Sequence, residues 1–184
     1  MSTKYRAKEP NAAYFVTLTI TDWIDVFTRL GQKHLLINSL AYCQRGKGLE
    51  IYAYCIMTSH LHMLCKAREG YLLSDIIRDF KKFTSRRIVK NILEYPESRR
   101  EWMLNAFKQA CNSLKRNQQY KVWQDGYHAE IAYSNRFIKQ KMDYIHNNPV
   151  VERIVEYPED YLFSSARNYA GLNHELEVVV VFMG

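Results

Sequence analysis

Hydrophobic and polar positions change their spacing several times along the chain, and each change predicts a new element. Residues 13–20 are rich in β-branched and aromatic side chains, which favours a strand buried on at least one face. Residues 32–45 carry leucines at roughly helical spacing, and Gly46 and Gly48 follow them. This pattern predicts a helix that ends at the first of these glycines.

A hairpin and a long helix are expected next. Residues 50–57 and 60–66 read as two strands separated by a two-residue turn, so they should pair with each other. A helix then begins with Ser74 or Asp75 as its cap and runs to about residue 91. Its apolar positions recur every three to five residues, while lysines and arginines fill the other positions. One face should therefore pack and the other should carry charge.

The second half of the chain predicts a less regular order. Residues 98–117 are helical or irregular, and residues 120–133 alternate as a fourth strand with a turn near Asp125-Gly126. A short helix is expected at 164–169, and the valine-rich run 178–182 is a candidate for an added strand.

One more helix, residues 136–147, is expected between the fourth strand and the tail. Ser134 or Asn135 caps its start, and Asn148-Pro149 closes it because the residue before a proline is disfavoured in helical geometry. The resulting order of elements predicts an α+β fold, a ferredoxin-like antiparallel sheet with helices packed mainly on one face. We expect one domain over residues 1–184, with a helical insertion near 91–118 and a C-terminal extension from about 158.

Charge and cysteine content narrow the class of protein. The 184 residues carry a net charge of +7, and residues 78–121 hold twelve Lys and Arg against four acidic residues. Such a segment is typical of phosphate binding, although a solvated helix face is an equally good interpretation. The four cysteines lack CxxC spacing, which favours buried thiols over a disulfide scaffold or a cysteine-based zinc site. No signal peptide or membrane span is apparent, so a soluble cytoplasmic protein is expected.

The pair His60 and His62 is the first candidate for chemistry. Side chains alternate across a strand, so both imidazoles should project from one face and could share a divalent metal. Two half-buried histidines without a ligand are the more common outcome of such a pair. Tyr144 and Asn148 stand four residues apart and share a helix face, which offers a phenol beside an amide oxygen, with Asn147 as the alternative ligand.

Together these groups suit a phosphodiester nuclease that works by covalent catalysis. A phenol is a weak nucleophile while protonated, but a phosphate bound to a divalent cation is a better electrophile. Tyr144 would attack in line and store the bond energy as a phosphotyrosine, so that a second strand end could reseal it without ATP. For a lone tyrosine among fourteen, an ordinary helix-packing role remains the competing interpretation.

Several motifs in a fixed order resemble one family. They are Thr58-Ser59-His60-Leu61-His62, Trp123-Gln124, residues 144–150 (YIHNNPV), Pro158–Tyr161 and Ser164-Ser165. This combination resembles the REP-associated tyrosine transposases, relatives of the IS200/IS605 transposases in the HUH endonuclease superfamily. The resemblance implies a Y1 transposase that cuts hairpin-containing single-stranded DNA through a 5′-phosphotyrosine, using Mg²⁺ or Mn²⁺. It also implies association with the nucleoid and leaves open whether the protein acts as a monomer or a homodimer.

Carried over to this chain, the resemblance assigns His60, His62 and Asn148 to the metal and Tyr144 to the nucleophile. The DNA contacts it suggests follow the hairpin and the fourth-strand region: Arg78, Lys81, Lys82, Arg86, Arg87, Trp123 and Gln124. In this interpretation the basic helix binds the DNA backbone, while the metal binds one phosphate of that backbone and Tyr144 attacks it.

The chain differs from the family pattern in two places, and two other functions are possible. Many relatives carry an Asp-His pair after Trp-Gln, whereas this chain reads Gly126–Glu130 there, so the role of that loop is open; residues 91–118 are also longer than a minimal enzyme needs. A domesticated protein that binds DNA or RNA hairpins without cutting is the first alternative. A zinc hydrolase using the histidine pair and a carboxylate is the second, disfavoured by the absence of an HExxH motif.

Overall fold

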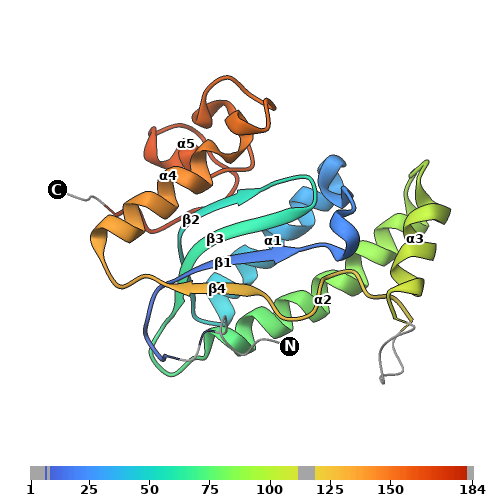
Figure 1. The fold of residues 1–184 in the computed structure, drawn as a ribbon, viewed down its shortest axis with the longest axis horizontal. Helices are drawn as coiled ribbons and strands as arrows, with labels where there is room; N and C mark the ends of the chain where they lie inside the picture. The colour runs from blue at the N-terminus through green and yellow to red at the C-terminus, as the bar shows by residue number, and fades with distance from the viewer. Residues whose placement is uncertain (1–6, 8, 112–118, 182–184) are drawn as a thin grey trace.

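A four-stranded antiparallel sheet forms the centre of the computed structural model, which describes residues 7, 9–111 and 119–181 (Figure 1). The strand order is β2-β3-β1-β4, and neighbouring strands are antiparallel throughout. This is the arrangement expected for a ferredoxin-like α+β fold, so the predicted fold class is confirmed. The strands are β1 (Tyr14–Thr19), β2 (Leu49–Ile56), β3 (His60–Ala67) and β4 (His128–Ile131).

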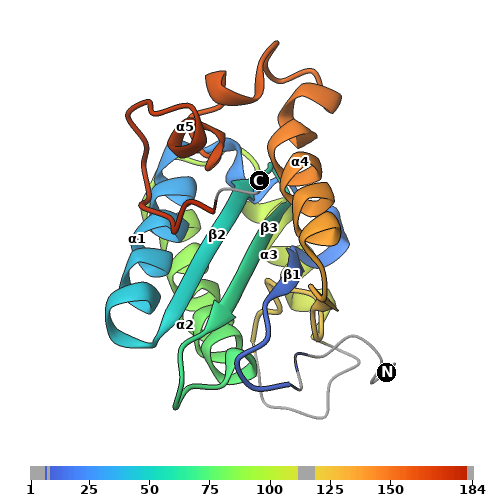
Figure 2. The same ribbon diagram turned by 90° about the vertical axis from the view of Figure 1, so that its left-hand side faces the viewer.

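Helices cover both faces of this sheet. Helices α1 (Leu30–Gly46) and α2 (Leu73–Glu94) pack on one face, and α4 (Asn135–Val151) lies across the other (Figure 2). Helix α3 (Arg100–Gln109) lies beyond one end of the sheet, and the short α5 (Ala166–Tyr169) sits beside α4 (Figure 1). Three 3-10 turns complete the described elements: η2 (Thr21–Trp23), η3 (Val26–Thr28) and η4 (Pro158–Asp160).

Side chains alternate between the two faces of the sheet along each strand, and this places the histidine pair on the face that contacts α4. Thr17 of β1 lies opposite His62 of β3, and His60, two residues earlier, shares that face. Leu61 between the two histidines points to the other face and is fully buried. Because Tyr144 of α4 packs on His62, the histidine face is the one that α4 covers. The sheet therefore separates the histidine pair from α1 and α2.

Several predicted boundaries are wrong. Only residues 128–131 of the predicted strand 120–133 form one, because the chain bends at Gly126, whose φ is 68°; Trp123 makes a single bridge with Ile20. Neither Ser74 nor Asp75 caps α2, whose N-cap residue Leu72 has no side-chain cap.

The C-terminal residues 178–181 and the predicted insertion near 91–118 contain less regular structure than expected. Residues 178–181 form no strand, although Val179 N donates a hydrogen bond to Ile51 O, and Phe182 lies outside the described residues. In the insertion, residues 100–109 are helical, and residues 112–118 lie outside the described part. All four cysteines are buried and free, as predicted.

Helix α4 continues through the proline that was expected to end it. Pro149 lies in the last turn, where its missing N–H removes one helical hydrogen bond, and the helix runs to Val151. The chain then turns at Arg153, whose φ is 57°, while Ile154 N donates to Pro149 O at 2.8 Å. Ser134 caps the start, because its side chain accepts a hydrogen bond from Phe137 N. Asn148 consequently lies inside the helix rather than beyond its end.

Hydrogen bonds and ion pairs connect the segment before α3 to the loop after β1. The buried carboxylate of Glu97 accepts hydrogen bonds from Arg99 and Arg29. Arg99 in turn donates to Asp25 O at 3.0 Å and to Thr28 Oγ1 at 2.9 Å. Hydrogen bonding from Arg99 lowers the pKa of Glu97 to about 2. The insertion is therefore anchored next to η3.

Replacing Glu97 tests this anchor through its pH dependence. A depressed carboxyl pKa stabilises the fold above the unfolded value near 4.5, and this contribution is lost as the pH falls toward 2. We expect Glu97→Gln to lower the free energy of unfolding by about 2 kcal/mol at pH 7 and by progressively less below pH 4.5. Urea unfolding of both proteins at several pH values measures this. A difference that does not shrink in acid would contradict the ionic origin.

Candidate active site

The two histidines stand together at the start of β3. Their ring centroids are 4.6 Å apart with an interplanar angle of 75°, and both come from the strand face beneath α4. His60 Nδ1 and Ser59 Oγ are 3.2 Å apart, so the last residue of the hairpin turn orients the first ring. The hairpin thus supplies a rigid base for the pair, as the sequence predicts.

His62 is buried and has one nitrogen without a partner. His62 Nδ1 and Thr17 Oγ1 share a 2.9 Å hydrogen bond, and the buried Nε2 has no hydrogen-bond partner among the described residues. Burial first, then the neighbouring His60 and Lys141, lowers the pKa of His62 to about 3. The ring is therefore neutral near pH 7, and in the tautomer in which Nδ1 donates to Thr17, Nε2 carries a lone pair for a ligand.

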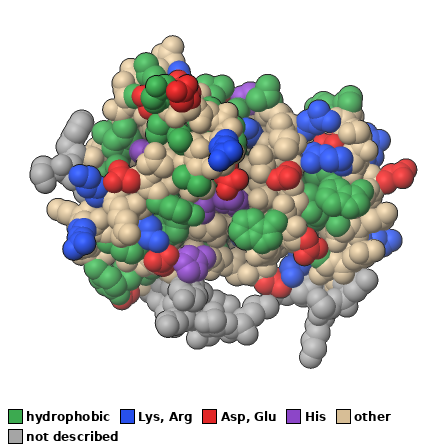
Figure 3. Space-filling model, turned by 45° about the horizontal axis from the view of Figure 1, so that its top comes forward, with side chains coloured by type: hydrophobic (Ala, Val, Ile, Leu, Met, Phe, Trp, Pro, Cys, Tyr) green, Lys and Arg blue, Asp and Glu red, His purple; other side chains and the backbone are tan. Residues whose placement is uncertain are grey.

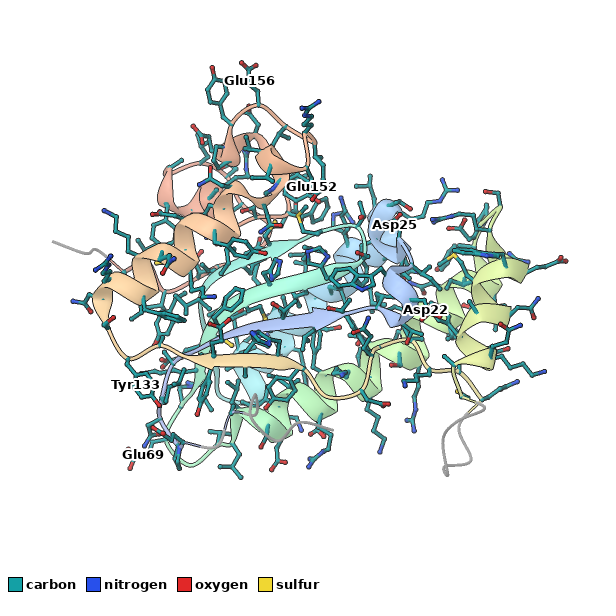
Figure 4. The ribbon with its side chains drawn as sticks, in the orientation of Figure 1. Asp22, Asp25, Glu69, Tyr133, Glu152 and Glu156 are labelled. Carbon is teal, nitrogen blue, oxygen red and sulfur yellow. The ribbon has the colours of Figure 1, made fainter. Side chains whose placement is uncertain are left out.

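His60 is closer to the surface and has acidic neighbours. Burial lowers its pKa, while the carboxylates of Glu152 and Asp25 act in the opposite direction. Figure 4 shows Glu152 at the C-terminal end of α4 and Asp25 in the loop after β1. Two acidic groups from different elements therefore act electrostatically on this ring, which adds negative potential near the histidine pair.

Helix α4 brings Tyr144 onto the pair. The tyrosine ring meets His62 edge-on at 5.3 Å between centroids and meets Phe15 at 5.8 Å. Half of the Tyr144 side chain is exposed, so a substrate can approach it from solvent. The structure therefore brings together three of the four predicted catalytic-site residues, His60, His62 and Tyr144.

Asn148 stands one helical turn beyond Tyr144 and is half-buried. Its Nδ2 donates a 3.1 Å hydrogen bond to Tyr144 O, which leaves the amide oxygen as the atom available to a cation. The alternative ligand, Asn147, uses its Nδ2 in the same way on Asp143 O at 2.8 Å. Because residues four apart share a helix face, Asn148 lies on the same face as Tyr144.

Four site residues were missed by sequence reasoning: Phe15, Thr17, Glu130 and Lys141. Lys141 lies one turn before Tyr144, pairs with Glu130 Oε1 at 3.0 Å and places its ammonium 4.3 Å from the Phe15 ring centroid. Phe15 also stacks on His62 at 5.6 Å. The alternation of side chains along β1 and the three-residue spacing of Lys141 from Tyr144 are both visible in the sequence. They predict no contact with the site until the strand pairing and the position of α4 are known. The open question about residues 126–130 is answered in part, because Glu130 borders the site.

The donor set fits a divalent cation. Two imidazoles and one amide oxygen leave positions for phosphate oxygens and water, and the orphaned Nε2 of His62 is the buried polar atom that such an ion would satisfy. Within the described residues, no group of three or more His, Cys, Asp or Glu could hold a metal ion.

The face of the molecule in Figure 3 has histidine side chains near its centre. Hydrophobic side chains surround them, and acidic and basic side chains are interspersed on the same face. The site that Tyr144 shares with the buried His62 is open to solvent at the tyrosine, which is 50% exposed.

Three of the seven predicted DNA contacts are used inside the fold. Lys81 donates to Gln124 O at 2.7 Å and also to Gly126 O, and burial lowers its pKa to about 8. Trp123 is buried and its Nε1 donates to Thr84 Oγ1 at 2.9 Å, so its ring is not available to a base. The half-buried Gln124 donates through its backbone and its side chain to β1 and the residue after it. These three residues hold the 123–126 segment against α2 and β1.

The other four predicted contacts remain on the surface of α2. Arg78 forms ion pairs with Asp75 and Asp79, whereas Lys82, Arg86 and Arg87 are exposed and have no ion-pair partner within the described residues. Together with residues 119–127, this helix lines an open groove. Helix α2, which lines the groove, lies on the sheet face opposite α4, the helix that carries Tyr144 (Figure 2). The basic residues of α2 and the nucleophile candidate Tyr144 therefore lie on opposite faces of the sheet, and a shared role in binding DNA stays a prediction.

Lys81 and Lys82 are adjacent in sequence, but we expect Lys81 to stabilise the fold and Lys82 to bind DNA. Lys81→Met leaves two backbone carbonyls without their donor, and we expect a loss of about 1–2 kcal/mol in the free energy of unfolding. Lys82→Met should leave that free energy within about 0.5 kcal/mol of the wild-type value. In DNA titrations over a range of salt, only Lys82→Met should lower the salt slope, by about one. Equal effects of the two variants in both assays would contradict this division.

Comparison with known proteins defines the class. The chain matches the family described as "Transposase IS200 like" over residues 11–107, which is more than half of its length. The protein therefore belongs to the IS200-like transposase family, and it is a DNA-binding tyrosine transposase of the Y1 type. The matched segment contains His60 and His62 and ends before Tyr144.

A solved structure agrees with this fold. A REP-associated tyrosine transposase bound to a REP hairpin is 22% identical, with a TM-score of 0.64 over 100% of this chain and 95% of that one. A second structure, a transposase described from Deinococcus radiodurans, is 19% identical, covers 79% of this chain and 97% of that one, and has a TM-score of 0.42. No curated protein matches the chain. Within the described residues, no helix is both long and apolar enough to span a membrane.

Proposed function

We propose that this transposase is a metal-dependent endonuclease and strand transferase for hairpin-containing single-stranded DNA, with Tyr144 as its nucleophile. The observation that carries the proposal is the packing of the half-exposed Tyr144 against His62, whose buried Nε2 has no partner within the described residues. A phenol directly beside a neutral imidazole with a free lone pair is an arrangement suited to phosphoryl transfer next to a bound cation.

His60, His62 and Asn148 would hold the cation, Mg²⁺ or Mn²⁺. Transposases of this family depend on divalent metals in general, and the choice of metal in this chain belongs to the proposal. A cation held by these residues would withdraw charge from the scissile phosphate and neutralise the charge that develops during transfer. Thr17 contributes by fixing the orientation of the His62 ring through the hydrogen bond at Nδ1.

Tyr144 then forms the covalent bond. Its hydroxyl oxygen attacks phosphorus in line with the 3′ oxygen of the upstream nucleotide, the new O–P bond forms, and the P–O3′ bond breaks. The tyrosine loses its proton and the leaving 3′ oxygen gains one. The products are a 5′-phosphotyrosine on the downstream strand and a free 3′-hydroxyl on the upstream strand. Attack by another 3′-hydroxyl on the phosphotyrosine reverses these steps and joins two strands without ATP.

The DNA partner is argued from charge and from the relative. The REP-associated relative is bound to a REP hairpin. In this chain, Lys82, Arg86 and Arg87 of α2 supply exposed positive charge beside the groove that residues 119–127 line. A DNA strand that contacts both this groove and Tyr144 would pass around the β4 edge of the sheet, because groove residues 119–127 lead directly into β4, which is one of the two terminal strands. Binding to chromosomal DNA would place the protein with the nucleoid.

A doubly labelled oligonucleotide tests the proposal. A single-stranded DNA hairpin with unpaired flanks carries one dye at each end and is incubated with the protein in Mn²⁺, Mg²⁺ or EDTA. We expect metal-dependent cleavage that leaves the 3′-end dye on the protein and releases the 5′-end dye on a strand with a 3′-hydroxyl. Retention of the intact hairpin without cleavage in either metal would favour a non-cleaving hairpin-binding protein instead.

A further inference from the structure

Trp23 is a large aromatic residue that the fold leaves in solvent beside the histidine pair. The residue is 59% exposed, and its ring meets His60 edge-to-face with the centroids 5.4 Å apart and an angle of 74°. Tryptophan is usually well buried in a folded protein, because its surface is mostly apolar. An exposed tryptophan in contact with a proposed metal ligand therefore points to a ligand that covers it.

The turn that exposes Trp23 to solvent has a strained backbone. Asp22 and Trp23 have φ values of 53° and 55°, so two consecutive non-glycine residues adopt the left-handed region. This region is unfavourable for a bulky side chain, and such strain concentrates where a site requires it. The residues on either side, Thr21 and Ile24, are buried. The turn is therefore fixed in the core at both ends, and only its tip presents the indole to solvent.

The turn is also tied to the elements that support the histidines. Trp23 N donates to Ile20 O at 3.0 Å, which joins the turn to the end of β1. Phe27 N donates to Thr58 O at 2.8 Å, which joins the following segment to the β2–β3 turn just before His60. Because both bonds run between backbone groups, the position of the indole relative to His60 is set by the fold.

The chemistry of this surface fits an unpaired nucleobase. A nucleotide couples a phosphate to a flat aromatic base, and here a flat aromatic side chain stands beside the residues proposed to act on a phosphate. Bases in a duplex are already stacked, whereas an unpaired base can stack on an aromatic side chain in a manner that tolerates any sequence. A neutral indole also carries no charge to repel a polyanion.

We propose that Trp23 stacks on the unpaired base of a nucleotide next to the scissile phosphate and thereby positions that phosphate at the histidine pair. Trp23 acts as a positioning residue, and this assignment rests on the proposed function. It identifies the substrate more closely, because it requires an unpaired nucleotide at the cleavage position.

The test compares Trp23→Leu with Trp102→Leu in EDTA, where binding is measured without cleavage. Trp102, on α3, is the matched control because it is 58% exposed, and no histidine contacts its ring within the described residues. The probes are a DNA hairpin with four unpaired nucleotides on one flank or the other and the same hairpin without flanks. We expect Trp23→Leu to weaken binding of one flanked probe about 10-fold. Binding of the unflanked hairpin should stay unchanged, and Trp102→Leu should change neither by more than about twofold.

Abasic sites locate the base. Replacing the unpaired bases one at a time should reveal one position at which the abasic substitution weakens the wild-type protein but not Trp23→Leu. Trp23→Phe, which keeps an aromatic face, should recover most of the affinity. In Trp102→Phe the exposed tryptophan within the described residues is Trp23, and flanked DNA should quench its fluorescence. This last readout remains valid even if Trp23→Leu does not fold.

The outcomes separate this inference from the proposed function. Wild-type affinity of Trp23→Leu for both flanked probes, or an equal loss for the unflanked hairpin, would overturn the stacking role, as would the absence of fluorescence quenching. Tyr144→Phe should show the same quenching as the wild-type chain, because stacking does not depend on bond cleavage. Quenching without cleavage in metal would overturn only the proposed reaction. Cleavage with no effect of Trp23 would overturn only the inference.

Discussion

Tyr144→Phe is expected to eliminate the covalent protein–DNA product and to reduce cleavage at least about 10³-fold, because the variant lacks the attacking oxygen. The ring and its contacts with His62 and Phe15 are retained, so the site should keep its shape. Affinity for the hairpin, measured by titration in EDTA, should remain within about twofold of the wild-type value. The covalent product is measured on a denaturing gel with DNA labelled at the 3′ end.

Tyr133→Phe is the matched control for this substitution. Tyr133 is 77% exposed and precedes the cap of α4, so the variant makes the same chemical change outside the site. It should form the covalent product at the wild-type rate. Undiminished cleavage by Tyr144→Phe would show that another group attacks the phosphate, whereas loss of activity in both variants would show a general requirement for tyrosine hydroxyls.

His62→Gln is expected to have the second-largest effect, a fall in cleavage of at least about 10²-fold. Glutamine can still bond Thr17, but it does not place a ring nitrogen where Nε2 stands. A second readout is independent of activity: Mn²⁺ should raise the melting temperature of the wild-type protein through binding to the folded state, and this rise should disappear in the variant.

His174→Gln controls for non-specific metal binding to histidine. His174 lies on the surface near the C-terminus and pairs with Glu177 at 2.6 Å, so its replacement should leave both the Mn²⁺ shift and cleavage intact. A Mn²⁺ shift that survives in His62→Gln would contradict the assignment of His62 as a ligand.

The sequence predicts the parts of the site that depend on local periodicity. Alternation along one strand is enough to place His60 and His62 on the same face, and helical spacing is enough to align Tyr144 with Asn148. The meeting of these two pairs depends on α4 crossing the sheet, which no local pattern encodes. The resemblance supplied that link in advance, and the contact between Tyr144 and His62 agrees with it.

The sequence does not show which side chains are already engaged inside the fold. Residue type does not reveal whether a cation is free or already donates to backbone carbonyls, as Lys81 does, or whether a tryptophan is buried, as Trp123 is. The supporting residues Thr17 and Lys141 were missed because their partners are distant in sequence. Trp23 was not singled out because its exposure and its positive φ are properties of the folded turn.

Identifying the residue that carries DNA is the most direct test of the central claim. After reaction with the hairpin in Mn²⁺, nuclease and trypsin digestion should release residues 142–153, since Lys141 and Arg153 flank this stretch, and Tyr144 is its one tyrosine. Mass spectrometry should find a nucleotide joined through its 5′-phosphate to this tyrosine, and the adduct should be absent in EDTA. A nucleotide on a different tyrosine, or cleavage without any nucleotide-bearing peptide, would contradict the account.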